Sequence, residues 1–170
     1  KERISHFVSR GAMDIDGFGG SLAERLVDEG LIKDIGDIYV IDREKLTALD
    51  GFGEKSADHL LASIEKSEQQ PLWRLINGLG IRHIGERNAQ MLAEEFGSLE
   101  AMMSADQEAF SGIPGIGAVL AASAYDFGQE EHNRELVQRL TEYGLTVAEE
   151  KKEPVGDLPL TGLTFVLTGK

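Results

Sequence analysis

Apolar and polar positions repeat four times along the chain, with the same internal order each time. A bulky apolar residue stands one position before a glycine, and an alanine stands four positions after it. The glycines are separated by 34, 32 and 32 residues, and they are Gly19, Gly53, Gly85 and Gly117. A fixed period of this length indicates one supersecondary unit repeated along the chain.

Each repeat predicts a helix, a tight hairpin and a second helix. In three repeats a further glycine precedes the apolar residue, at Gly17, Gly51 and Gly115, and glycine tolerates the positive φ of a tight turn. Apolar residues at helical spacing follow each hairpin, and the alanine permits close approach of the preceding helix. In the third repeat His83 replaces the first glycine. We therefore expect its backbone to turn differently.

The segments between the repeats are also similar, which predicts that repeats one and two pair and that repeats three and four pair. Residues 35–53 align with residues 96–117, with three extra residues before the second hairpin. We expect an all-α domain from about Ile4 to Phe127, extended by a helix over residues 130–144. Residues 148–157 predict a charged linker, and residues 158–170 predict the first strand of another domain.

Composition excludes several classes of function. The 170 residues suit one domain, or one domain and a fragment of another, and we expect the chain to be part of a longer protein. No apolar run approaches the roughly 20 residues of a membrane span, and there is no cysteine for a disulfide or a thiolate metal site. The histidines show no metal-ligand spacing, and no acid–base pair or Lys-x-Asp-Gly motif occurs. We predict a soluble intracellular protein whose present residues are neither catalytic nor metal-binding.

The hairpins predict a surface for a polyanion. At the start of each second helix several backbone N–H groups lack partners, and the helix dipole favours negative charge there. Such donors bind phosphate and sugar rather than base sequence. Lys55 and Arg87 follow their hairpin glycines, and Arg82 could contact phosphate or pair with Glu86. Plain structural turns remain the alternative, and we expect at least one hairpin to be purely structural.

The net charge of −13 opposes binding to a nucleic acid, because DNA-binding domains are usually basic. Charges on the far side of the molecule are screened over a Debye length of about 8 Å, and neutral amide donors release no counterions. We therefore expect modest affinity with a shallow dependence on salt.

Several stretches resemble a known family. The stretch over residues 46–61, LTALDGFGEKSADHLL, resembles the helix-hairpin-helix motif of proteins that bind DNA without sequence preference. Three stretches of the chain resemble bacterial NAD-dependent DNA ligases in their order and spacing. They are HFVSRGAMDIDGFG, LINGLGIRHIGERNAQML and LTGLTFVLTGK. The resemblance covers essentially the whole chain.

The resemblance implies a division of the chain. Residues 1–15 would follow a zinc finger that is absent here, residues 16–147 would form a four-repeat helix-hairpin-helix domain, and residues 148–157 would be a linker. Residues 158–170 would begin a truncated α/β BRCT domain. The fold class is thus all-α tandem helix-hairpin-helix repeats, four hairpins in two pairs, followed by a BRCT start. The implied DNA-binding glycines are Gly17, Gly19, Gly51, Gly53, Gly80, Gly85, Gly115 and Gly117.

The resemblance also implies a function for the longer protein. It would seal nicks in double-stranded DNA during bacterial replication and repair, as a cytoplasmic, nucleoid-associated monomer that uses NAD, Mg²⁺ and a structural Zn²⁺. The present residues would hold the duplex through its phosphate backbone and minor groove, without cofactor. They lack the adenylated lysine and should be inactive alone.

Three other functions remain open. A non-enzymatic scaffold of a repair or junction complex could use the same hairpins. A helix-hairpin-helix glycosylase needs a catalytic Lys or Asp and an aromatic base pocket, but Lys55 stands too early in its helix and aromatic residues are few. A purely protein-binding module would keep its DNA affinity, if any, after Gly53→Asp.

Overall fold

The computed structural model describes residues 2–149, and within this range the chain is helical, as predicted. Its one β-bridge within that range joins Ser98 to Ala148. The elements in chain order are α1 (Glu2–Val8), α2 (Gly20–Asp28), the 3-10 helix η1 (Ile35–Val40), α3 (Arg43–Thr47), α4 (Glu54–Ser67), α5 (Leu72–Gly78), α6 (Glu86–Phe96), α7 (Leu99–Ser104), α8 (Gln107–Ser111), α9 (Ala118–Gln129) and α10 (Glu131–Glu142). Residues 150–157 of the predicted linker and the predicted strand over residues 158–170 lie outside the described range.

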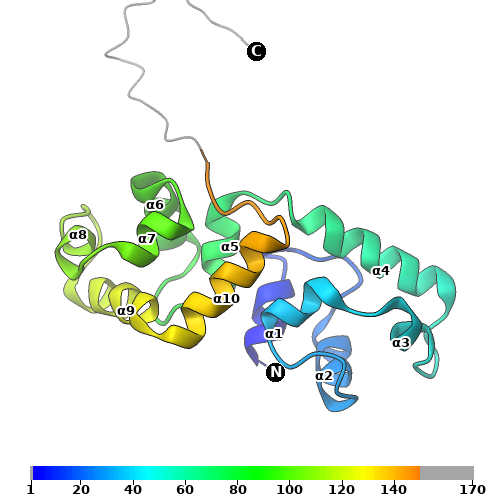
Figure 1. Cartoon of the computed structure of the whole chain (residues 1–170). Helices are drawn as coiled ribbons and strands as arrows, with labels where there is room; N and C mark the ends of the chain where they lie inside the picture. The colour runs from blue at the N-terminus through cyan, green and yellow to red at the C-terminus, as the bar shows by residue number, and fades with distance from the viewer. Residues whose placement is uncertain (1, 150–170) are drawn as a thin grey trace, which may run out of the picture.

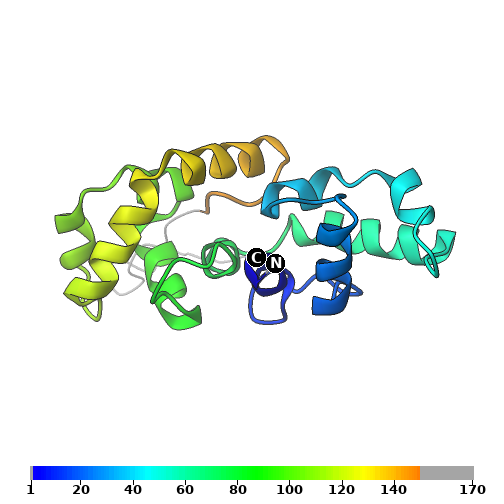
Figure 2. The same cartoon turned by 90° about the horizontal axis from the view of Figure 1, so that it is seen from below.

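The helices form two lobes around a central group (Figure 1). Helices α2, α3 and α4 lie at one end of the molecule, and α6, α7, α8 and α9 lie at the other. Between the lobes are α1, α5 and α10. In Figure 2 helix α10 runs along one long edge, and the connection from α1 to α2 lies at the opposite edge.

Each repeat buries its alanine, and three of the four repeats also bury the bulky apolar residue of the hairpin. The alanine that follows each hairpin has no exposed surface in any of the four repeats: Ala23, Ala57, Ala89 and Ala121. Of the apolar hairpin residues, Phe18, Ile84 and Ile116 are buried and Phe52 is half-buried. Because a larger residue at the alanine position would separate the packed helices, the repeat pattern is a consequence of core packing.

The predicted similarity between the two spacer segments is confirmed, but the predicted offset of three residues is wrong. Asp34 caps η1 and Ser98 caps α7, and each cap lies 19 residues before the glycine that begins the helix after the hairpin. Asp42 caps α3 and Asp106 caps α8, and these two caps also lie at equal distances from the glycines of their hairpins. The two spacers therefore match without an insertion, and their side-chain caps define the register.

Helix α5 joins the second half of the chain to the first. The buried Asn77 side chain donates to the Gly11 carbonyl at 2.8 Å, and Arg74 donates to the carbonyls of Arg10 and Ala12. Helix α1 contributes Phe7 and its apolar neighbours to the same core as the repeats. These hydrogen bonds satisfy carbonyl groups of the turn after α1, which has no helix or sheet to satisfy them.

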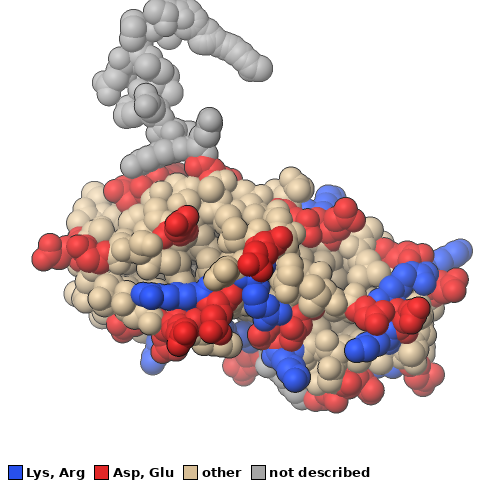
Figure 3. Space-filling model, viewed as in Figure 1, with Lys and Arg blue, Asp and Glu red and all other residues tan. Residues whose placement is uncertain are grey.

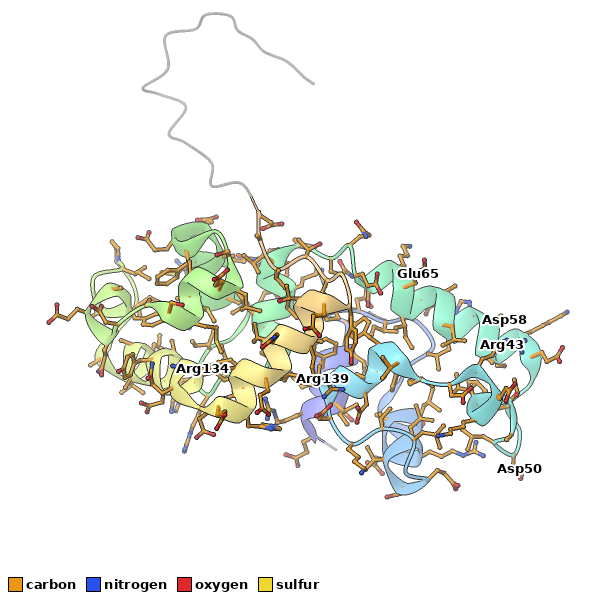
Figure 4. The ribbon with its side chains drawn as sticks, in the orientation of Figure 1. Arg43, Asp50, Asp58, Glu65, Arg134 and Arg139 are labelled. Carbon is orange, nitrogen blue, oxygen red and sulfur yellow. The ribbon has the colours of Figure 1, made fainter. Side chains whose placement is uncertain are left out.

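Helix α10, predicted over residues 130–144, makes a second link between the halves. Arg139 on α10 donates to both carboxylate oxygens of Asp34, at 3.1 and 3.0 Å, and to Asp37 at 2.9 Å. A Cβ on Gly36 would lie 2.7 Å from the Arg139 guanidinium carbon, so glycine there leaves room for the charged group. Figure 4 shows Arg139 directed from α10 toward the η1 segment.

Candidate nucleic-acid interface

The four hairpins share one hydrogen-bonding pattern. We define hairpins 1, 2, 3 and 4 as residues 14–19, 48–53, 80–85 and 112–117. In each, the amide of the apolar residue donates to the carbonyl three positions earlier: Phe18 to Ile15, Phe52 to Leu49, Ile84 to Ile81 and Ile116 to Ile113, at 3.0–3.1 Å. The following helix then begins with a bond from the repeat alanine to the hairpin's last glycine, at 2.9–3.0 Å. The repeat in sequence is thus a repeat in backbone geometry.

The tight turn uses a positive φ in every hairpin, including the third. Gly17, Gly51 and Gly115 have φ of 82°, 79° and 92°. His83 has φ of 69°, and the Ile84 bond to Ile81 closes the same turn. The expectation that hairpin 3 would turn differently is therefore wrong. A non-glycine residue can adopt the left-handed conformation at a cost in free energy, and histidine does so here.

A second position distinguishes the two hairpins of each pair. Five residues before the last hairpin glycine, hairpins 1 and 3 have left-handed residues, Asp14 with φ of 49° and Gly80 with φ of 69°. At the same position hairpins 2 and 4 have the right-handed residues Ala48 and Gly112, both with φ of −76°. The alternation relates hairpin 1 to hairpin 3 and hairpin 2 to hairpin 4, which agrees with the two similar pairs that the spacers predicted.

The last glycine of each hairpin is required neither by its conformation nor by packing. Gly19, Gly53, Gly85 and Gly117 have φ between −97° and −82°, which any residue can adopt. A Cβ built on any of them would meet no atom within 4 Å. Nothing within the described residues therefore explains why glycine, rather than a residue with a side chain, precedes all four helices.

These glycines leave the helix starts without a side-chain cap. No side chain bonds to the first amides of α2, α4, α6 or α9, and within the described residues their first three amides have no hydrogen-bond acceptor. By contrast, Asp34, Asp42, Ser98 and Asp106 accept hydrogen bonds at the starts of η1, α3, α7 and α8. Because the first two residues of each hairpin helix are exposed, their amides can donate to an external acceptor.

The predicted cationic residues lie where the sequence placed them. Lys55 and Arg87 occupy the second position of α4 and α6, and Arg82 lies within hairpin 3. All three side chains are exposed and have no hydrogen-bond or ion-pair partner among residues 2–149. The alternative of an Arg82–Glu86 pair is thus not present. Whether these residues or the hairpin glycines contact DNA stays a prediction.

The hairpins differ in charge. Hairpin 1 exposes Asp14 and Asp16, and Asp16 pairs with His59 at 3.0 Å. Hairpin 4 is neutral, because residues 112–125 contain no charged side chain. Hairpin 3 exposes Arg82 and His83, and Glu86 and Arg87 follow at the start of α6. We predicted no binding role for His83 from the sequence.

The rest of the surface offers no continuous basic region on the face that Figure 3 shows. Acidic and basic side chains are interspersed there, over α10 and the neighbouring helices. Among the described residues no group of three or more His, Cys, Asp or Glu side chains could hold a metal ion. None of the helices described here has the length and apolar character that crossing a bilayer requires.

The fold and the paired hairpins define a tandem helix-hairpin-helix protein. Two family models agree with this class: a SAM-like helix-hairpin-helix tandem matches residues 10–66, and a helix-hairpin-helix motif matches residues 74–137. These ranges coincide with the two pairs of hairpins. The chain therefore contains helix-hairpin-helix repeats in tandem over these two ranges.

Its curated homologues are DNA ligases. The chain is 48% identical over 169 residues to the DNA ligase of Koribacter versatilis, and this match covers 99% of the chain and 25% of the relative. It is 45% identical over 169 residues to the DNA ligase of Acidobacterium capsulatum, with 99% and 25% covered. DNA ligase 2 of Deinococcus deserti is 45% identical over 168 residues, with 99% and 24% covered. The chain thus spans about a quarter of the length of these relatives.

Proposed function

We propose that the chain is the DNA-binding region of a bacterial NAD-dependent DNA ligase that seals nicks during replication and repair. In this role it holds nicked double-stranded DNA as a monomer in the cytoplasm, associated with the nucleoid. It contacts the phosphate backbone along the minor groove without reading base sequence. The homology to DNA ligases over nearly the whole chain supports this function, as does the geometry of the hairpins.

One observation carries the proposal: all four hairpin helices begin with a glycine that neither backbone conformation nor packing requires. A serine or aspartate there would stabilise the helix by accepting a hydrogen bond from its first amides. It would also occupy those amides and place a Cβ in front of them. Glycine is explained if a phosphate group approaches the bare amides closely.

The chemistry of these donors explains binding without sequence preference. Backbone amides at a helix start donate to the non-bridging oxygens of a phosphate, and those oxygens are the same at every base pair. Each hairpin presents its amides in the same arrangement relative to its helix. Two hairpins of a pair can therefore hold two phosphate groups, and two pairs can hold both strands.

The cofactors of the proposed enzyme do not fit the residues of this chain. There is no cysteine to ligate Zn²⁺ and no Lys-x-Asp-Gly motif to accept an adenylyl group. No metal cluster exists among residues 2–149 to ligate Mg²⁺. We therefore assign NAD, Zn²⁺ and Mg²⁺ to other parts of the proposed enzyme, and no chemical step to these residues.

The double variant Gly53→Ser, Gly117→Ser tests the proposal. Each serine can cap its helix, so the free energy of unfolding should stay at the wild-type value or rise by a few tenths of a kcal/mol (~0.3). Affinity for a nicked duplex should fall about tenfold, because two sets of amides are then occupied and obstructed. Fluorescence anisotropy of a labelled duplex and chemical denaturation measure the two quantities.

Ser98→Gly is the matched control, because Ser98 caps a helix that follows no hairpin. Removing that cap should lower stability and leave DNA affinity unchanged, which is the opposite result. Wild-type affinity in the double serine variant, with both serines tolerated by the fold, contradicts the proposal that bare amides hold the DNA.

A further inference from the structure

Arginine side chains in this acidic protein are mostly engaged by the protein itself. Of the nine arginines, six donate to a carbonyl or carboxylate group within the described residues: Arg3, Arg25, Arg43, Arg74, Arg134 and Arg139. Arg10, Arg82 and Arg87 do not. Two of these three lie in or beside hairpin 3, so the arginines available to an external anion are concentrated there.

His83 lies between these two arginines, at the tip of the hairpin. Its φ of 69° holds it in the left-handed region, at the position where the other three hairpins have glycine. Glycine would adopt this conformation at lower cost, so the turn itself does not favour histidine. The imidazole is exposed, and it makes no hydrogen bond or ion pair with residues 2–149 that would offset the cost of this conformation.

Asp14 offers an internal comparison. Within the described range, Asp14 and His83 are the two non-glycine residues with positive φ. Asp14 lies in hairpin 1, whose backbone geometry is similar to that of hairpin 3. Hairpin 1, however, exposes Asp14 and Asp16, whereas hairpin 3 exposes Arg82 and His83, and the start of α6 adds Glu86 and Arg87. Two hairpins of similar shape thus have opposite charge. A polyanion is therefore repelled by the tip of hairpin 1 and attracted by the tip of hairpin 3.

We infer that hairpin 3 is the cationic anchor of the DNA-binding surface and that His83 is a DNA-contacting residue. The His83 imidazole donates a hydrogen bond to a phosphate oxygen, and Arg82 and Arg87 neutralise the adjoining phosphates. Hairpin 1 holds phosphate only through the amides at the start of α2, because Asp14 and Asp16 make its tip acidic. This inference rests on the proposed function, and it identifies which hairpin binds through side chains in addition to amides.

His83→Gly is the decisive variant, because glycine favours the observed φ and the turn should persist. We expect affinity of the 170-residue chain for a nicked duplex to fall about tenfold, the lower end of the effect of losing one hydrogen bond to a charged group. The thermal midpoint should stay the same or rise. In the Arg82→Gln, Arg87→Gln variant the slope of log K against log salt should become shallower by about 2, since each phosphate contact contributes about 0.9.

Asp14→Gly is the matched control, because it relieves the same kind of backbone conformation in the acidic hairpin. Its thermal midpoint should rise, and its DNA affinity should be unchanged or tighter. Wild-type affinity in His83→Gly, or an equal loss in Asp14→Gly, overturns the inference while Gly53→Ser, Gly117→Ser still tests the proposed function. Absence of saturable binding by the wild-type chain overturns both.

Discussion

At the scale of the residue, two glycines in each hairpin have different roles. Gly115 has a positive φ and is required by the turn, whereas Gly117 has φ of −82° and open space where a Cβ would be. The first glycine is therefore explained by conformation and the second by access to the amides behind it. The sequence alone does not distinguish these two roles, because both positions are glycine.

Gly115→Ala and Gly117→Ala should therefore differ in stability. The first should cost about 2 kcal/mol, because alanine is strained at positive φ and its Cβ would lie 2.7 Å from the Met91 methyl carbon. The second should cost about 0.5 kcal/mol, the difference between glycine and alanine as helix caps. Chemical denaturation measures both. Equal losses would show that the two glycines have the same structural role.

His83 shows what residue patterns could not predict. The sequence indicated a hairpin at residues 80–85, and the structure contains it, but the replacement of glycine suggested a different turn. The left-handed conformation is unfavourable for histidine rather than forbidden, so the surrounding hairpin can impose it. The residue type determines the free-energy cost of the left-handed conformation, and the tertiary structure determines whether the residue adopts it.

At the scale of the element, the apolar periodicity predicted the helices well and the spacer alignment less well. The helices before hairpins 2 and 4 and the long helix α10 were predicted from local pattern. The spacer alignment failed because it matched the beginnings of the two segments, Ile35 with Phe96, rather than the capping residues. Aligning Asp34 with Ser98 places their following apolar residues in register, Ile35 with Leu99 and both buried.

The link between α10 and η1 could not be predicted, because Arg139 and Asp34 are far apart in sequence. Partial burial opposes ionisation of Asp37, but hydrogen bonds from the Lys33 amide, Arg139 and the Asp34 amide outweigh it and lower the pKa of that carboxyl. A carboxyl whose pKa is lowered in the folded state stabilises the fold at pH values above its ordinary pKa of 3.8. That contribution is lost as the pH falls through the lowered pKa.

Arg139→Met should destabilise the fold by about 1–2 kcal/mol at pH 7, since it removes three hydrogen bonds to two carboxylates that are about one-third exposed or less. The difference from wild type should shrink as the pH falls below 3.8 toward the lowered pKa of Asp37. Denaturation at pH 7 and pH 3 measures both values.

Arg43→Met provides the control, because Arg43 on α3 pairs with Asp58 on α4 and both side chains are exposed (Figure 4). Exposed pairs contribute little to stability, so this variant should resemble wild type. A loss for Arg139→Met that is as small as the control's, or that does not change with pH, would show that α10 is held by apolar contacts alone.

At the scale of the whole molecule, an acidic chain presents bare amides at four points. The chain has 30 acidic and 17 basic side chains, yet many acids lie outside the hairpins, and screening weakens their effect over about 8 Å. The pairing of repeats was predicted from sequence and agrees with the two family matches. The links through α5 and α10 that hold the pairs together were not predicted, because they join segments distant in sequence.

The most direct test of the central claim is an amide-resolved titration of the chain with a nicked duplex by ¹⁵N NMR. We predict that the largest shift changes occur at the first amides of the hairpin helices, over residues 54–56, 86–88 and 118–120. Smaller changes are expected at residues 20–22, beside the acidic tip of hairpin 1. Changes centred on α10 and η1, with the hairpin amides unmoved, would contradict it.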